Sequence, residues 1–184
     1  MIIGLIAAAA VVLLLVIWLI SLFNKLVRRR NQVDNAWAQI DVQLKRRYDL
    51  IPNLVESVKG YAAHERGVFE AVVAARERAL TSTGPGDAAQ NNNMLSGALK
   101  SLFAVAEAYP DLKANANFLS LQQELAATED RAAYARQYYN DAVLGFNNSI
   151  STFPAVMVAG MLGFRSREFF RAGEGETAAV RVQF

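Results

Sequence analysis

His64 is the single histidine in the sequence and the first residue to test for catalytic or metal-binding chemistry. Di-metal carboxylate sites in helical bundles use glutamates together with a Glu-x-x-His motif, but the residue three positions before His64 is Tyr61. The zinc motif His-Glu-x-x-His also fails, because position 68 is a valine. The sequence therefore predicts no metal site at His64, which we expect on a helix surface.

Other residue types that carry chemistry are missing or isolated. The chain has no cysteine, which excludes thiolate nucleophiles, thiolate metal sites and disulfides. Its serines lack a plausible general base, and no glycine-rich loop suits a phosphate. The net charge is only +2, which gives no electrostatic footprint for nucleic acid. We therefore predict that the chain is not an enzyme and has no cofactor, no metal and no nucleic-acid partner.

Charged residues gather near the end of the first predicted helix and just after it. Arg47 falls on the apolar seam of that helix, and we predict that it pairs with Glu56 or Glu107. Two interpretations stay open, a structural charge network and a binding patch for a partner. The predicted network consists of Asp41, Arg47, Asp49, Glu56 and Glu107, with Arg46 beside it.

These residues must be positioned by what precedes them, an apolar stretch at residues 2–23. Residues 2–20 carry no polar side chain, and about 21 helical residues cross a hydrocarbon core of roughly 30 Å. A cleaved signal peptide or a buried core helix are the alternatives, but nothing basic precedes the apolar run, as a signal peptide requires. We predict a retained transmembrane anchor that includes Ile2, Ile6, Leu13, Ile17, Trp18 and Leu22.

The flanking charge predicts the orientation of this anchor. Lys25, Arg28, Arg29 and Arg30 follow the span closely, and positive charge beside a span favours the cytoplasmic side. The same residues are suited to attract anionic lipid headgroups. We predict a single-pass protein of the bacterial cytoplasmic (inner) membrane, with the amino terminus outside and the rest of the chain in the cytoplasm.

Beyond the span, apolar residues recur at helical spacing and predict an all-α fold. The predicted helices cover about 24–49, 52–82, 87–109 and 112–152, and together form the domain 24–152. The first continues the transmembrane helix without a turn signal. Pro52 is expected to begin the second helix, and Asp87 with Gln90 resembles a capping box for the third. Short connections predict an antiparallel, up-down-up-down four-helix bundle.

The carboxyl-terminal tail, residues 153–184, is more apolar than an exposed terminus should be. An up-down-up-down order brings its start back toward the membrane. Contact with the lipid interface or with another subunit is one interpretation, and packing against the bundle end is the other. The candidate contact residues are Phe153, Val156, Met157, Met161, Leu162, Phe164, Arg165, Arg167, Phe169 and Phe170. Residues 178–184 alternate like a short strand, with disorder as the alternative.

Three stretches of the sequence resemble the LemA family. They are NAWAQIDVQLKRRYDLIPNLVESVKGYAAHE from Asn35, ANFLSLQQELAATEDRAAYARQYYNDAV from Ala116, and FPAVMVAGMLGF from Phe153. The resemblance implies a bacterial or archaeal protein with one amino-terminal transmembrane helix and a soluble antiparallel four-helix domain, and it supplies no catalytic residues. A magnetosome-associated relative is implicated in membrane remodelling, which makes that role an expectation by analogy.

Two functions follow from these patterns. The first is a self-associating membrane scaffold, a homo-oligomer whose tail touches lipid or the next subunit. The second is an adaptor or regulator that presents a helical groove to an unidentified membrane or cytoplasmic protein. The continuous first helix and the apolar tail favour the scaffold.

Overall fold

The computed structural model describes residues 1–171 of the 184-residue chain. Its regular elements are all helical within that range: α1 (Ile2–Lys59), α2 (Arg66–Leu80), α3 (Pro85–Glu107), α4 (Pro110–Lys113), α5 (Ala116–Ser151) and a 3-10 turn, η1 (Ala155–Met157). The all-α class is therefore confirmed. The predicted strand at residues 178–184 lies outside the described residues.

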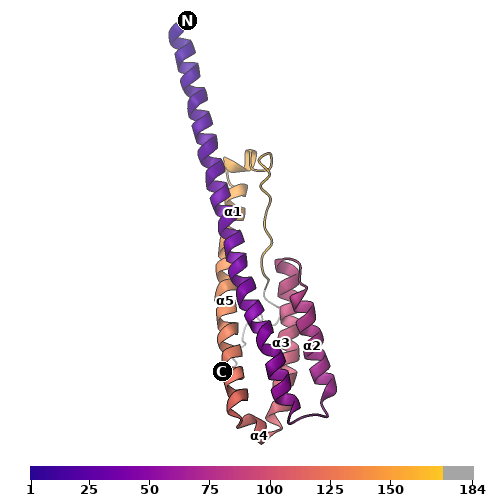
Figure 1. Ribbon diagram of the computed structural model, residues 1–184. Coiled ribbons are helices and arrows are strands. Elements are labelled where there is room, and N and C mark those ends of the chain that lie inside the picture. Colours follow the sequence, from indigo (N-terminus) through magenta and orange to yellow (C-terminus); the bar gives the residue numbers. More distant parts are fainter. Residues whose placement is uncertain (172–184) are drawn as a thin grey trace, which may run out of the picture.

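Helix α1 joins the apolar stretch to the rest of the molecule without a break, as predicted. It contains 58 residues, which gives a length of about 87 Å at 1.5 Å per residue. Its amino-terminal part projects beyond all other elements (Figure 1). This part is long and apolar enough to cross a membrane, and none of its most apolar window is buried by the rest of the chain. The buried core helix is thereby excluded.

The prediction that Pro52 begins a second helix is wrong, because α1 runs through Pro52 to Lys59. A proline inside a helix cannot donate to the carbonyl four residues earlier, which here belongs to Tyr48. Arg76 of α2 replaces that bond, since its Nε donates to the Tyr48 carbonyl oxygen at 2.8 Å. Burial of Ile51 and Leu54 on either side of the proline further holds α1 in place. Packing between helices thus overrides the local preference.

Helices α3 and α5 begin close to the predicted positions, whereas α2 begins well after the predicted start at residue 52. A loop at residues 60–65 separates α1 from α2, so α2 is shorter than the predicted 52–82. Gly84 caps α3 with a φ of 89°, a left-handed conformation that suits glycine. Asp87 is not the cap residue and instead accepts from the backbone N–H of Thr83 at 2.9 Å. The expected capping box is therefore absent here.

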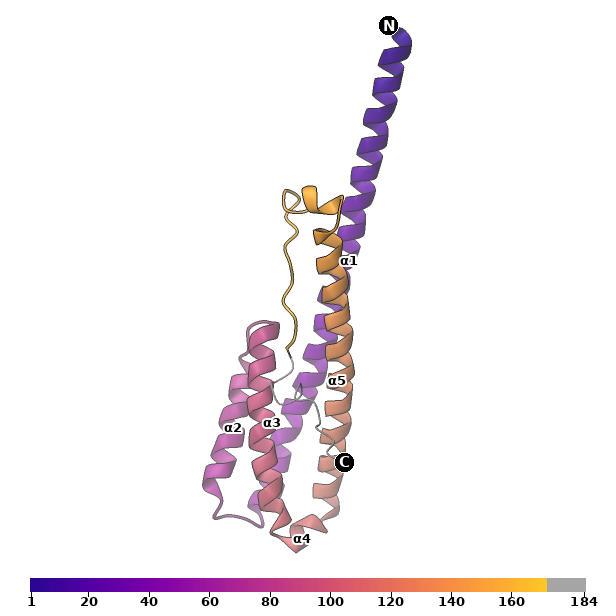
Figure 2. The same ribbon diagram turned by 180° about the vertical axis from the view of Figure 1, so that it is seen from behind.

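The helices pair in two groups in the part of the molecule remote from the amino terminus. Helix α1 packs chiefly against α5, and α2 packs against α3. Figures 1 and 2 show α2 returning toward the amino-terminal side, α3 running away from it and α5 returning again. The short α4 joins α3 to α5 at the far end. Buried apolar side chains along these helices form one core.

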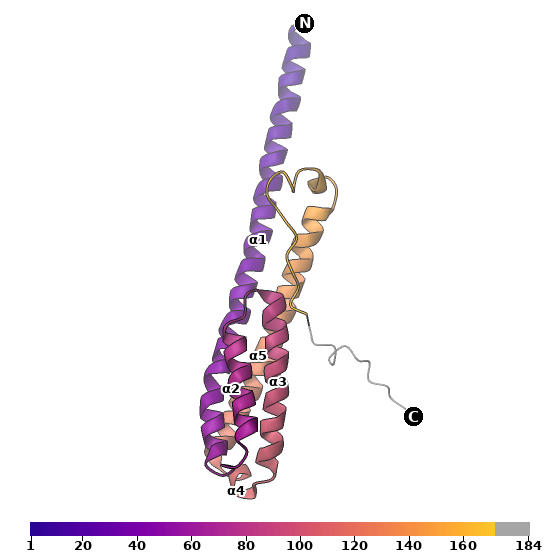
Figure 3. The ribbon, with the colours of Figure 1, turned by 90° about the vertical axis from the view of Figure 1, so that its right-hand side faces the viewer.

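The chain folds back after α5. Residues 153–163, which we call the tip, form a compact series of turns that includes η1. Residues 164–171, which we call the strap, then run without regular secondary structure back along the molecule. Figure 3 shows the tip at the end of α5 and beside α1, where the projecting part of α1 begins.

Candidate functional site

A buried arginine lies at the centre of the helical part, but its partners differ from those predicted. The Arg47 guanidinium pairs with Glu129 at 2.8 Å and donates to the side-chain oxygens of Asn92 at 2.7 Å and Ser96 at 3.0 Å. Burial lowers the pKa of Arg47, and the nearby Glu129 carboxylate opposes this effect. The arginine therefore ties α1 to both α3 and α5.

The predicted pairing of Arg47 with Glu56 or Glu107 is wrong. Both glutamates are exposed, and each has a lysine as partner: Glu56 contacts Lys59 at 2.8 Å and Glu107 contacts Lys113 at 2.7 Å. Within residues 1–171, Asp41 and Asp49 lie in no ion pair, whereas Arg46 pairs with Glu124 at 3.1 Å. The reason is that Arg47 faces the interior, where an exposed carboxylate does not reach.

A groove opens between α3 and α5 beside this arginine. It has a volume of about 390 Å³ and is lined by Leu99 and Phe103 from α3 and by Leu125 from α5. Its charged lining consists of Lys100 and of Arg47 paired with Glu129. Ring centroids of Phe103 and Phe118 lie 6.5 Å apart near its far end. We call this the α3/α5 groove.

A second, larger groove lies between α1 and α5. Its volume is about 580 Å³, and its lining includes Val42 of α1 together with Arg131, Tyr134 and Tyr138 of α5. Tyr134 is 75% exposed and Val42 is 61% exposed. We call this surface the α1/α5 groove. It presents large apolar and aromatic side chains that the described part of the chain leaves uncovered.

The strap is held against α5 by two asparagine side chains. Asn147 donates to and accepts from the backbone of Arg167, at 2.9 and 2.8 Å, and Asn140 binds the backbone of Phe170 in the same way, at 3.0 and 2.9 Å. Seven residues of α5 rise about 10.5 Å, which three extended strap residues match. The two side-chain amides therefore hydrogen-bond the backbone of the extended strap at matching intervals.

Further contacts fix the strap at the same level. The Tyr139 hydroxyl donates to the Glu168 carbonyl at 2.8 Å, and Arg167 pairs with Asp34 of α1 at 2.8 Å. Burial raises the pKa of Tyr139 to about 12, because the neutral phenol is favoured there; Arg167 opposes the effect. Phe170 is buried against Trp37, with ring centroids 6.4 Å apart.

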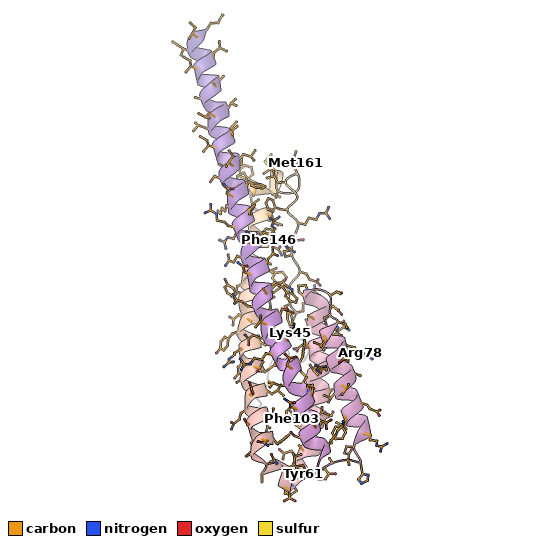
Figure 4. All side chains as sticks on the ribbon, in the orientation of Figure 1. Lys45, Tyr61, Arg78, Phe103, Phe146 and Met161 are labelled. Carbon is orange, nitrogen blue, oxygen red and sulfur yellow. The ribbon has the colours of Figure 1, made fainter. Side chains whose placement is uncertain are left out.

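The candidate contact residues of the tail therefore separate into two sets. Phe164 and Phe170 are buried by the protein itself and Leu162 is half-buried, in agreement with packing against the helices. The exposed set consists of Phe153, Val156, Met157, Met161, Arg165, Arg167 and Phe169. Figure 4 shows Met161 at the outer end of the tip and Phe146 beneath it. Contact of the exposed set with lipid or a subunit stays a prediction.

Phe164 joins the tip to the end of the apolar stretch. Its ring lies edge-on to Phe23 of α1, with centroids 5.7 Å apart, and 6.4 Å from the ring of Phe146. The Arg30 guanidinium stands 5.8 Å from the Phe164 ring centroid. The tip therefore lies at the level where the apolar residues of α1 give way to basic ones.

His64 lies in the loop between α1 and α2 and is exposed there, so its predicted place on a helix surface is wrong. Within residues 1–171, no three metal-ligating side chains of the His, Cys, Asp or Glu type come together. Sequence reasoning missed Asn92, Glu129, Asn140 and Asn147. Asparagine at 140 and 147 repeats at the seven-residue spacing of one helix face, which was the available signal.

These features define an all-helical, membrane-associated protein with one amino-terminal helix able to span a bilayer. The chain belongs to the LemA family, whose sequence model matches residues 36–184. It is 29% identical to Protein LemA of Metamycoplasma hominis over 161 residues, covering 85% of this chain and 72% of the relative.

Magnetosome proteins are also among its relatives. Magnetosome protein MamQ 2 of Paramagnetospirillum magneticum and Magnetosome protein MamQ of Magnetospirillum gryphiswaldense are each 25% identical over 192 residues. Each match covers 90% of this chain and 71% of the relative. None of these names is that of an enzyme.

Proposed function

We propose that this protein is a non-enzymatic scaffold of the bacterial cytoplasmic membrane that self-associates at the cytoplasmic face. In this proposal α1 crosses the membrane with its amino terminus outside, and α1, α2, α3 and α5 act as an antiparallel four-helix bundle. Lys25 and Arg28 to Arg30, which are exposed just past the span, support the orientation. The magnetosome names of two relatives are consistent with an organising role at a membrane.

The observation that carries the proposal is the exposed α1/α5 groove, one wall of which belongs to the same continuous helix that bears the predicted membrane span. Val42 and Tyr134 present large apolar surface there, and aromatic residues are enriched in protein interfaces. Because α1 fixes every copy at one height and in one orientation, the same groove meets its neighbours at the same level. A second copy of this chain is therefore the occupant that we propose.

Substitutions in the α1/α5 groove test this function. Wild type in mild detergent should give a mass above that of a monomer. The double variant Val42→Gln with Tyr134→Gln should weaken association about a hundredfold or more, since burial of such side chains contributes about 1.5–3 kcal/mol each. Val73→Gln, a change of the same type at an exposed position on α2, serves as the control. A monomeric wild type at all concentrations would contradict the proposal.

The second candidate is an adaptor that presents the α3/α5 groove to another protein, which the partly apolar lining of that groove and the exposed Lys100 favour. Lys100→Glu reverses the charge at its rim without touching the α1/α5 groove. If the adaptor function holds, Lys100→Glu loses its captured partner and keeps the oligomer mass. If the scaffold function holds, only the Val42→Gln, Tyr134→Gln variant should show a lower oligomer mass, and Lys100→Glu should not.

A further inference from the structure

The tip carries a cluster of large apolar side chains that the described residues leave uncovered. Met161 is 88% exposed and Phe153 is 79% exposed, with Met157 and Val156 beside them. No charged or polar side chain occurs between positions 153 and 164. Exposed apolar clusters of this kind mark contact with a membrane or with another protein.

The backbone of the tip is suited to a medium that offers few hydrogen-bond partners. Its amides donate to carbonyls within the turns, as from Ala159 to Ala155 at 2.8 Å, from Leu162 to Val158 at 3.0 Å and from Phe164 to Ala159 at 3.0 Å. Irregular backbone enters the apolar part of a bilayer only where its polar groups are paired. The tip meets this condition at these amides.

The height of the tip is fixed relative to the membrane span. Phe23 is the last residue of the apolar stretch and Lys25 is the first basic residue after it. Phe164, the first residue of the strap and next to the tip, packs against Phe23. In the proposed crossing of α1, the exposed side chains therefore stand where the hydrocarbon region of the bilayer begins. Arg30 beside Phe164 and Arg165 after it place positive charge at the level of the lipid headgroups.

We propose that the tip inserts as a wedge into the same leaflet that α1 enters, with Phe153, Met157 and Met161 among the acyl chains and the basic residues on anionic headgroups. Interfacial segments of this kind reach about 5–10 Å into the bilayer. The wedge gives each protomer a second attachment, which holds α1 at a fixed tilt and displaces lipid in one leaflet only. This inference rests on the proposed membrane crossing of α1.

Depth measurements on the full-length protein test the wedge. The chain has no cysteine, so Met161→Cys, Leu13→Cys and Asp141→Cys each provide one site for an environment-sensitive fluorophore. Each labelled protein is placed at one copy per nanodisc of phosphatidylcholine and phosphatidylglycerol. Lipids with a nitroxide on the acyl chain quench a fluorophore that lies in the bilayer, and a water-soluble quencher acts on a fluorophore that lies in water.

We expect the probe at position 161 to shift to shorter wavelength and to lose most of its emission to the lipid nitroxide, as at position 13. The probe at position 141, on the exposed surface of α5, should respond to the aqueous quencher only. Equal aqueous quenching at 161 and 141 would overturn the wedge. So would protection of position 161 from both quenchers, which indicates contact with protein.

The controls separate this inference from the proposed function. Without lipid quenching at position 13, the membrane crossing of α1 fails and both proposals fall. With lipid quenching at position 13 but not at 161, the wedge alone is wrong. The mass measurements on variants of the α1/α5 groove are made in detergent and test self-association separately from both quenching results.

Discussion

At the scale of single residues, the chain uses polar side chains to join elements rather than to perform chemistry. Arg47 links α1 to α3 and α5, and Asn140 and Asn147 hold the strap through its backbone. Their partners were beyond sequence reasoning, because side chains from remote helices meet only once the helices pack. The seam position of Arg47 was readable from spacing, whereas Glu129 as its partner was not.

The strap should detach at high pH because of Tyr139. The pKa of its phenol is raised to about 12, so the neutral form stabilises the fold fully below the ordinary tyrosine pKa of about 10, and that contribution is lost as the pH rises through 12. Ionisation also removes the donor to the Glu168 carbonyl. A dye on Ser166→Cys should lose fluorescence anisotropy between about pH 10 and pH 12.

Tyr139→Phe provides the control for this pH dependence. It cannot ionise at this position, so the anisotropy of the same dye should stay level over that range. Burial also raises the pKa of Tyr48 to about 12, but Tyr48 is present in both proteins, so its ionisation cannot cause a difference between them. A fall of the same size in Tyr139→Phe would show that another group causes the release.

At the scale of elements, the helices were predictable from apolar spacing, and the ends of helices were less so. The continuity of the apolar stretch with the first helix as far as residue 49, the loop before α3 and the return of α5 all followed from the sequence. The prediction at Pro52 was wrong because proline removes a backbone hydrogen bond of a helix and therefore often ends it. Here Arg76 of α2, 24 positions later in the sequence, donates the missing hydrogen bond to the Tyr48 carbonyl. Only the packed structure reveals that repair.

The repair predicts a coupling between positions 52 and 76. Arg76→Met leaves the Tyr48 carbonyl without its donor and should lower the free energy of unfolding by about 1–3 kcal/mol. In a Pro52→Ala background the new backbone N–H reaches the same carbonyl, so Arg76→Met should cost about 1 kcal/mol less. Denaturant unfolding of the four proteins in detergent measures both values. Strict additivity of the two substitutions would refute the repair.

At the scale of the whole molecule, α1 is the element on which the other arrangements depend. Because it carries the apolar span, the packing face for α5 and the aromatic contact with Phe164 next to the tip, it relates all three in space. The proposed oligomer and the proposed wedge both require that relation to be rigid. Sequence patterns predicted the continuity but not the place where the tip returns to α1.

The distance between two spin labels on α1 tests its continuity most directly. Labels on Ser21→Cys and Lys45→Cys, spin-diluted with unlabelled protein in nanodiscs, are separated by 24 residues, or about 36 Å along a straight helix. We expect one narrow distance distribution centred near that value. A broad distribution, or one shifted well below it, would mean that α1 bends between the membrane and the helical part, and would contradict the account.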